Sequence, residues 1–283
     1  MGAANLIEIK RRLKSVESTK KITRAMGLVA TSKLRKSRKE LKVNEEFASI
    51  AKRNMEIVSS IVDDELGVSN IKSVSDDLVL YITISSDSGL CGGYNNNVVS
   101  HLKNISGSNK DNIGVISLGN KGISYLKRAR FNILAEYVDI ADVPTIKEVD
   151  NIYKKIIKLC TEQNISKVNI VYTEFHSPVK FVVKSEQLLP VEKAKSEVRA
   201  ELIEPNLDIV YKDTLDMYLK GKLRSCILSA KCSEQSSRMA AMNGATSNAE
   251  DIISALNSKF NRIRQTMITQ EISEIVGGAE AQK

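Results

Sequence analysis

The sequence contains no tryptophan and two histidines, and Phe, Trp and Tyr together make up 5% of its 283 residues. Such a low aromatic content fits a chain with much helix–helix surface and one modest core. The two histidines, His101 and His176, are too few for a His-rich metal site. We therefore expect neither a large aromatic core nor a bound metal.

Disulfides and long apolar runs are also missing. The four cysteines do not form the pattern of a secreted disulfide framework. Cys226 and Cys232 are the closest pair, and on a helix they would lie roughly 9 Å apart, beyond disulfide reach. The longest apolar run is about residues 78–81, so we expect no membrane span, and any membrane association must go through a partner.

Proline is absent after Pro205, and the residues that follow have coiled-coil periodicity. A helix over residues 206–283 would be roughly 110 Å long at 1.5 Å per residue, so it needs a partner helix to bury its apolar face. Apolar or small residues recur in it at steps of three and four: Met239, Met242, Thr246, Ala249, Ile253, Leu256, Phe260, Ile263 and Met267.

The start of the chain supplies the partner, with the same spacing and an N-cap candidate at Asn5. Its seam, meaning the a and d positions, comprises Leu6, Ile9, Leu13, Val16, Lys20, Thr23, Gly27, Ala30, Leu34, Ser37, Leu41, Asn44, Ala48, Ala51, Met55, Val58 and Val62. Several members are poor core residues. The coil either has a thin core or, as we favour, touches something besides its twin helix at the small and polar positions.

Positive charge is concentrated in the first helix. Residues 1–60 hold 15 Lys and Arg against 6 Asp and Glu, whereas the whole chain has a net charge of +8. A basic helix is typical of nucleic-acid binding, of an acidic membrane surface or of an acidic protein collar, and it can also be a solvated face. Because the coil must fit into something, we favour an acidic or polar protein sleeve.

Strand and helix patterns alternate between the two long helices. Strands are expected at 78–84, 113–118, 131–138, 167–175 and 180–189, with an amphipathic helix from Thr145 to about Gln163. This order predicts a doubly wound, mainly parallel α/β domain inserted into a long antiparallel coiled coil. The expected division is 1–66 for the N-terminal helix, 67–204 for the insert and 205–283 for the C-terminal helix.

The loop from Ser85 to Asn97 is glycine-rich and joins a strand to a helix, as phosphate-binding loops do. It contains neither G-x-G-x-x-G nor a P-loop lysine, so its glycines are expected to serve a tight turn and close helix–sheet packing. Cys91 and Ser88 lack the motifs of catalytic nucleophiles. The residues alone thus indicate a non-catalytic coiled-coil protein with an α/β insert.

Three blocks of the sequence carry a family resemblance. IKRRLKSVESTKKITRAMGLVATSKLRKS near the start, SSDSGLCGGYNNNV in the middle, and SEQSSRMAAMNGATSNAEDII with FNRIRQTMITQEISEIVGGAEA at the end resemble the gamma subunits of F-type ATP synthases. The blocks occur in the family's order and reach both ends of the chain. The chain length and the helix–insert–helix plan also agree with that family.

The resemblance implies a central-stalk rotor subunit with no nucleotide, cofactor or catalytic site of its own. Its partners would be the alternating alpha and beta subunits of the catalytic hexamer, the epsilon subunit and the membrane-embedded c ring. Rotation of the ring would turn the asymmetric coil, which biases each beta subunit between open, loose and tight states. With no signal peptide expected, the chain would lie at the cytoplasmic face of a bacterial membrane, as a peripheral subunit.

The resemblance also implies residue roles. Arg264, Gln265 and Thr269 match the stretch that engages loops of the beta subunits. Met26 matches the position near the acidic lever segment of beta, or else is only a packing residue at the edge of the seam. Hexamer contacts are further implied for Lys20, Lys21, Arg24 and Arg238, and a c-ring contact for Glu204.

Two other function classes stay open on the residues alone. The first is a nucleic-acid-binding coiled coil, which the basic first helix suggests but no recognised reading module supports. The second is a nucleotide-dependent enzyme built on the insert, which would be stabilised by its ligand.

Overall fold

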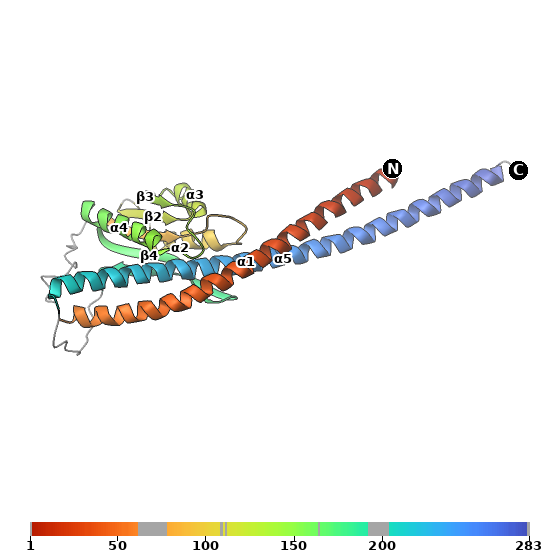
Figure 1. Ribbon diagram of the computed structural model, residues 1–283. Helices are drawn as coiled ribbons and strands as arrows, with labels where there is room; N and C mark the ends of the chain where they lie inside the picture. The colour runs from red at the N-terminus through yellow and green to blue at the C-terminus, as the bar shows by residue number, and fades with distance from the viewer. Residues whose placement is uncertain are drawn as a thin grey trace. The chain divides into compact units, whose positions relative to one another are not determined.

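The computed structural model describes residues 2–61, 78–107, 110, 112–163, 165–191 and 204–281 (Figure 1). Its helices are α1 (Gly2–Ser59), α2 (Tyr94–Ser106), α3 (Asn120–Arg128), α4 (Ile146–Glu162) and α5 (Leu207–Ala281). Its strands are β1 (Leu78–Ile84), β2 (Ile113–Leu118), β3 (Asn132–Tyr137), β4 (Ile165–Ser177) and β5 (Lys180–Leu189). The predicted end of the first helix at Val62 and the predicted boundary at 66 and 67 lie outside the described residues.

The chain forms two compact units, and α1 and α5 contribute to both. The smaller unit comprises Met1–Val29 with Met239–Lys283, and the larger comprises Ala30–Arg238. Among the described residues, no helix is long and apolar enough to cross a membrane.

The larger unit is built on a five-stranded sheet of order β3-β2-β1-β4-β5. Neighbouring strands are parallel except β4 and β5, which form an antiparallel hairpin. The near-continuous apolar run of β1 and the fully buried β2 are what a sheet covered on both faces requires. The predicted doubly wound, mainly parallel insert is therefore confirmed.

Helices cover both faces of this sheet. On one face, Val98 and Leu102 of α2 and Leu126 of α3 pack against Val115 and Val171. On the other face, α4 and α5 pack against strands β1 and β4, through residues that include Ile152, Ile156, Leu219, Leu223, Leu80 and Ile170. The C-terminal helix is thus part of the core of this unit.

Side-chain caps are present at the starts of α4 and α5, whereas α2 and α3 begin after glycines without one. Thr145 caps α4 in a capping box, because its hydroxyl accepts from the Glu148 amide and Glu148 accepts from the Thr145 amide. Asn206 accepts from the Ile209 amide at 2.9 Å at the start of α5. The predicted cap at Asn5 is wrong, because α1 already begins at Gly2 and Asn5 lies inside the helix.

The predicted seam of α1 is confirmed in both units. From Leu6 to Val58, every seam position is buried or half-buried, while most positions between them are exposed. The seam of α5 from Met239 to Met267 is also buried or half-buried throughout. A spacing of three and four is visible in a single sequence because it follows directly from helix geometry.

The polar seam positions are satisfied mostly by the twin helix. In the smaller unit, the hydroxyls of Thr23 and Thr246 lie 2.8 Å apart, and Lys20 pairs with Glu250 at 2.9 Å. In the larger unit, Asn44 donates to the Gly221 carbonyl and to the Ser225 hydroxyl. These three residues are thus bonded to the twin helix, and the contact of the coil with something besides its twin stays a prediction. In each unit, residues of increasing number along α1 contact residues of decreasing number along α5, so the two helices are antiparallel.

Charged side chains join β5 to α5. Lys222 lies 3.1 Å from one carboxylate oxygen of Glu186, and the Tyr172 hydroxyl donates to the other at 3.1 Å. Burial alone would raise the pKa of Glu186, but the positive charges of Lys222 and Lys184 outweigh it and hold the pKa below its ordinary value near 4.5.

This lowered pKa predicts an acid-sensitive contribution to stability. Because the folded pKa lies below the unfolded one, Glu186 stabilises the fold above about pH 4.5, and this contribution disappears as the pH falls through the folded pKa. It amounts to at most about 1 kcal/mol for such a partly exposed pair. Denaturation titrations at several pH values should show that the free energy of unfolding falls less steeply with acid for Glu186→Gln than for the unsubstituted chain. Equal slopes would contradict the assignment.

Candidate functional site

The glycine-rich loop lies where β1 ends, at the carboxyl edge of the parallel strands. In sheets of this kind ligands bind at that edge, where the strand order reverses. Gly92 has a φ of +58°, which turns the loop, and Gly93 immediately precedes α2. The predicted tight turn is confirmed at Gly92, whereas close helix–sheet packing is not what these glycines serve, because a Cβ at Gly89, Gly92 or Gly93 would meet side-chain atoms at 3.5 Å or more.

The first amides of α3 are the donors that a phosphate would need at this edge. In the structure, the Asn120 amide donates to Asp87 Oδ1 at 3.1 Å, the Lys121 amide to the Ser86 carbonyl at 2.9 Å, and the Gly122 amide to Ser85 Oγ at 3.0 Å. The loop itself therefore fills the position of a phosphate.

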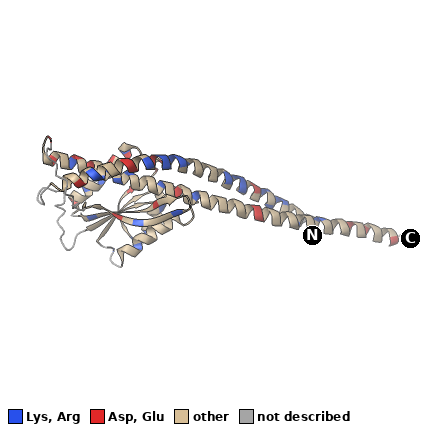
Figure 2. Ribbon diagram, turned by 90° about the horizontal axis from the view of Figure 1, so that it is seen from below, with Lys and Arg blue, Asp and Glu red and all other residues tan. Residues whose placement is uncertain are grey.

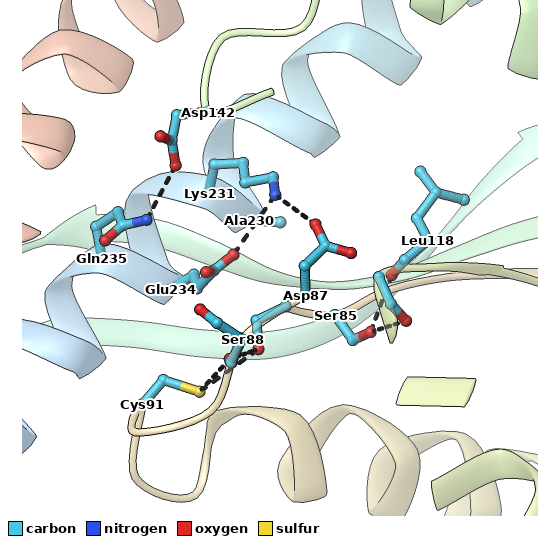
Figure 3. Close-up of polar contacts among 12 residues, drawn as sticks. Ser85, Asp87, Ser88, Cys91, Leu118, Asp142, Ala230, Lys231, Glu234 and Gln235 are labelled. Atoms are coloured by element: carbon cyan, nitrogen blue, oxygen red, sulfur yellow. Dashed lines mark hydrogen bonds and ion pairs between the residues drawn. The ribbon is translucent and has the colours of Figure 1, made fainter. Parts of the chain in front are cut away.

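Three charged side chains of α5 enter the same edge, and Figure 3 shows two of them, Lys231 and Glu234. Lys231, Glu234 and Arg238 have side chains only 5–8% exposed. Lys231 Nζ lies 3.6 Å from Asp87 Oδ2 and 3.7 Å from Glu234 Oε2, and Arg238 lies 2.8 Å from Glu234 Oε1. Glu234 Oε2 is buried without a hydrogen-bond partner among the described residues, so its attraction to Lys231 is what compensates its charge.

Further hydrogen bonds fasten the loop to α5. The Arg238 guanidinium donates to the Ser88 carbonyl and hydroxyl at 3.2 and 3.0 Å. The Ser237 hydroxyl donates to the Cys91 carbonyl at 2.7 Å, and the Tyr94 hydroxyl donates to the Ala230 carbonyl at 3.0 Å. Burial, followed by the charge of Glu234, raises the pKa of Tyr94 well above its ordinary value, so this donor keeps its proton. The loop is thus bound to α5 along about two helical turns.

The site offers few groups for covalent chemistry. Cys91 is 2% exposed, and burial raises the pKa of Cys226 to about 12 and that of Cys160 to about 11, so both of these thiols stay protonated near neutral pH. Within the described ranges, no group of three His, Cys, Asp or Glu side chains is arranged to hold a metal ion. The hydrogen bonds and ion pairs described above fix one long helix to the edge of the sheet.

The structure brings some of the sequence-predicted residues together on α1. Met26 is half-buried, Lys21 and Arg24 are exposed, and Lys20 pairs with Glu250 of α5. The hydrogen bond and charge of Lys20, with a smaller effect of Arg24, lower the pKa of Glu250. These residues form a basic surface around one carboxylate in the smaller unit.

The remaining predicted residues lie elsewhere. Arg264, Gln265 and Thr269 are exposed on α5 in the smaller unit. Arg238 is buried in the larger unit with its guanidinium directed at the loop. Glu204 is exposed just before α5.

Sequence reasoning missed the charged residues that bind the glycine-rich loop to α5, namely Asp87, Lys231 and Glu234. One signal was present, because Lys231, Glu234 and Arg238 recur at steps of three and four on a helix face whose neighbours are apolar or small. Nothing local in the sequence distinguishes such a buried charged face from a solvated one.

Comparisons with known proteins agree on one family. A protein-family profile described as ATP synthase matches residues 5–282. The chain is 54% identical to the ATP synthase gamma chain of Clostridium botulinum over the full length of both. It is 26% identical to a chain from the central stalk and c ring of the Tetrahymena thermophila mitochondrial ATP synthase, with a TM-score of 0.63 over 79% of this chain and 99% of that one. A chain of the Euglena gracilis mitochondrial ATP synthase is 15% identical with a TM-score of 0.70, covering 99% of this chain and 95% of that one, and shows the fold alone.

Proposed function

The chain belongs to the family of ATP synthase gamma chains, and from this membership we propose that it is the central-stalk rotor subunit of an F-type complex. It transmits rotation of the c ring to the alpha and beta subunits, with the epsilon subunit alongside. The observation that carries this proposal is the full-length identity to gamma chains. The nucleic-acid-binding alternative has no comparable support, because the comparisons reported above all point to ATP synthase.

The subunit itself is non-catalytic and takes no cofactor. In support, the donors that a phosphate would need at the sheet edge are already bound by Ser85, Ser86 and Asp87. It is a peripheral subunit of a membrane complex, positioned at the cytoplasmic face of a bacterial membrane. The segments 1–66, 67–204 and 205–283 serve as the first stalk helix, the insert and the second stalk helix.

The end of α5 engages the beta subunits through Arg264, Gln265 and Thr269. In support, every residue from Ile268 to Glu280 is exposed, including the apolar side chains of Ile272, Ile275 and Val276. An apolar helix end that its own chain leaves uncovered favours a protein sleeve. Arg264 supplies the planar donor that a carboxylate accepts in bidentate fashion.

The basic surface of α1 meets the acidic lever segment of the beta subunits. Figure 2 shows how Lys and Arg gather along this helix. Lys21, Arg24 and Met26 form the contact, while Lys20 is already paired with Glu250 and contributes less. Arg238 acts indirectly in this region, by holding the Ser88–Gly89 backbone in place. Glu204 lies at the foot of the stalk, near the c ring.

Charge reversal at Arg264 tests the proposal. In a complex reconstituted from membrane and catalytic subunits, Arg264→Glu should lower the rate of ATP synthesis about tenfold, the effect of losing one hydrogen bond to a charged group. Arg262→Glu makes the same charge change on the opposite side of the helix and should have little effect. Recovery of the tagged chain from solubilised membranes without ATPase subunits would overturn the rotor assignment, whereas equal rates for both variants would overturn the role of Arg264.

A further inference from the structure

The loop between β3 and α4, residues 138–145, touches both long helices of the larger unit. On the α1 side, the Ser37 hydroxyl donates to the Asp142 carbonyl at 3.0 Å, and Lys33 Nζ lies 2.8 Å from Asp142 Oδ2. Lys33 and Ser37 are four residues apart and so lie on one face of α1. Ser37 occupies a seam position and is fully buried, so its hydroxyl needs this acceptor.

On the α5 side, the other carboxylate oxygen of Asp142 accepts a hydrogen bond. Gln235 Nε2 donates to Asp142 Oδ1 at 3.0 Å, as Figure 3 shows, and Gln235 is 2% exposed. Asp142 thus divides its three acceptor oxygens between the helices, two for α1 and one for α5. We call Asp142 with Lys33, Ser37 and Gln235 the Asp142 junction.

A second set of bonds repeats the arrangement further along the same helices. Arg224 of α5 donates from Nε to the Pro144 carbonyl at 3.2 Å and from a terminal nitrogen to Asn44 Oδ1 at 2.9 Å. Its other terminal nitrogen lies 3.6 Å from a carboxylate oxygen of Glu40. The loop and the two helices therefore meet through directional polar contacts at two levels.

The α1 seam at this level places small and polar residues between the large apolar residues Leu34 and Leu41. The α1 seam residues Ala30 and Ser37 are small, and Asn44 is polar. Apolar contacts are non-directional and tolerate sliding, whereas hydrogen bonds to charged groups lose their energy within a small displacement. Polar groups in a coiled-coil seam are the best-attested devices for setting register.

We propose that Asp142 is a positioning residue that locks α1 and α5 in register against the insert, so that torque acting on the insert reaches both helices together. This inference rests on the proposed rotor function. It assigns to the β3–α4 loop a role in coupling that is separate from the contacts to the hexamer. The role requires all arms of the junction, because a loop held by one helix alone would let the other turn or slide.

The readout is the ratio of ions translocated to ATP hydrolysed, measured on membrane vesicles that carry the assembled complex. Asp142→Ala should lower this ratio, because the loss of a hydrogen bond to a charged group shifts the equilibrium toward the slipped register about tenfold. Gln235→Ala, which cuts only the α5 arm, should lower it in the same direction. A merely structural role would reduce the amount of assembled complex and leave the ratio unchanged.

Asp150→Ala is the matched control. The side chains of Asp150 and Asp142 are equally exposed at 26%, and Asp150 also accepts from two partners, but these are Lys154 of α4 itself and Lys220 of α5. It does not reach α1, so its variant should keep the ratio. An unchanged ratio in both Asp142→Ala and Gln235→Ala, or an equal fall in Asp150→Ala, would overturn the proposal. If vesicles that carry the unsubstituted chain translocate no ions, the proposed rotor function itself is contradicted.

Discussion

Replacing Gly119 with alanine is expected to lower the free energy of unfolding of the α/β insert by about 3 kcal/mol or more. Gly119 has a φ of +99°, a conformation that residues with a Cβ rarely adopt. A Cβ there would also lie 2.3 Å from the Ser85 carbonyl oxygen, which is backbone and cannot turn away. Backbone strain and overlap therefore add up at one position.

Hydrogen exchange measures this effect where it arises. In Gly119→Ala, the amides of β1 and β2 should lose protection, because Ser85 and Gly119 terminate these neighbouring strands. Gly93→Ala is the control, since a Cβ at Gly93 would meet only the Asn97 side chain, at 3.5 Å or more. Gly93→Ala should keep the amide protection of β1 and β2. If Gly119→Ala also kept it, the close approach of Gly119 to Ser85 would be contradicted.

Glu234→Ala is expected to destabilise the larger unit by about 3–5 kcal/mol, the usual cost of removing one partner from a buried ion pair. Glu234 lies between Lys231 and Arg238, so its removal leaves two buried positive charges with less compensation. The loss should appear as a lower denaturation midpoint in far-UV circular dichroism. Glu250→Ala removes an exposed pair with Lys20 and should leave the denaturation midpoint nearly unchanged.

Replacing the whole group separates charge compensation from packing. A variant with Lys231→Met, Glu234→Leu and Arg238→Met removes all three charges and keeps the volume, so it should recover most of the stability lost in Glu234→Ala. If Glu234→Ala were as stable as Glu250→Ala, the charges would be compensated by water rather than by each other. If the triple variant were the least stable, the bonds of Arg238 to Ser88 would outweigh the cost of burying the charges.

Much of the fold could be predicted because it is encoded in local periodicity. The seam from Leu6 to Val58 and the buried strand at 78–84 each follow from the repeat of their own element. The spacing of Thr145 and Glu148 likewise indicates the start of a helix from four consecutive residues. The prediction of a cap at Asn5 is wrong because the residues before Asn5 are also compatible with a helix, so local signals did not fix where the helix begins.

The contacts of the site could not be predicted because their partners are far apart in sequence. Ser37 and Asp142 are separated by 105 residues, and Arg238 and Ser88 by 150. In a single sequence, nothing next to a charged residue indicates whether its side chain is solvated or buried. The family resemblance directed attention to the ends of the helices instead, and it placed Arg238 among partner contacts although its guanidinium is bound inside the chain.

The exposed apolar end of α5 bears on how much of the unassembled chain accumulates in a cell. Four apolar side chains near the end of this helix, Ile268, Ile272, Ile275 and Val276, are 48–71% exposed, so an unassembled chain presents an apolar surface to other proteins. Proteases and chaperones recognise such segments. We therefore expect an unassembled chain to be degraded faster than one whose α5 end is covered by the other subunits.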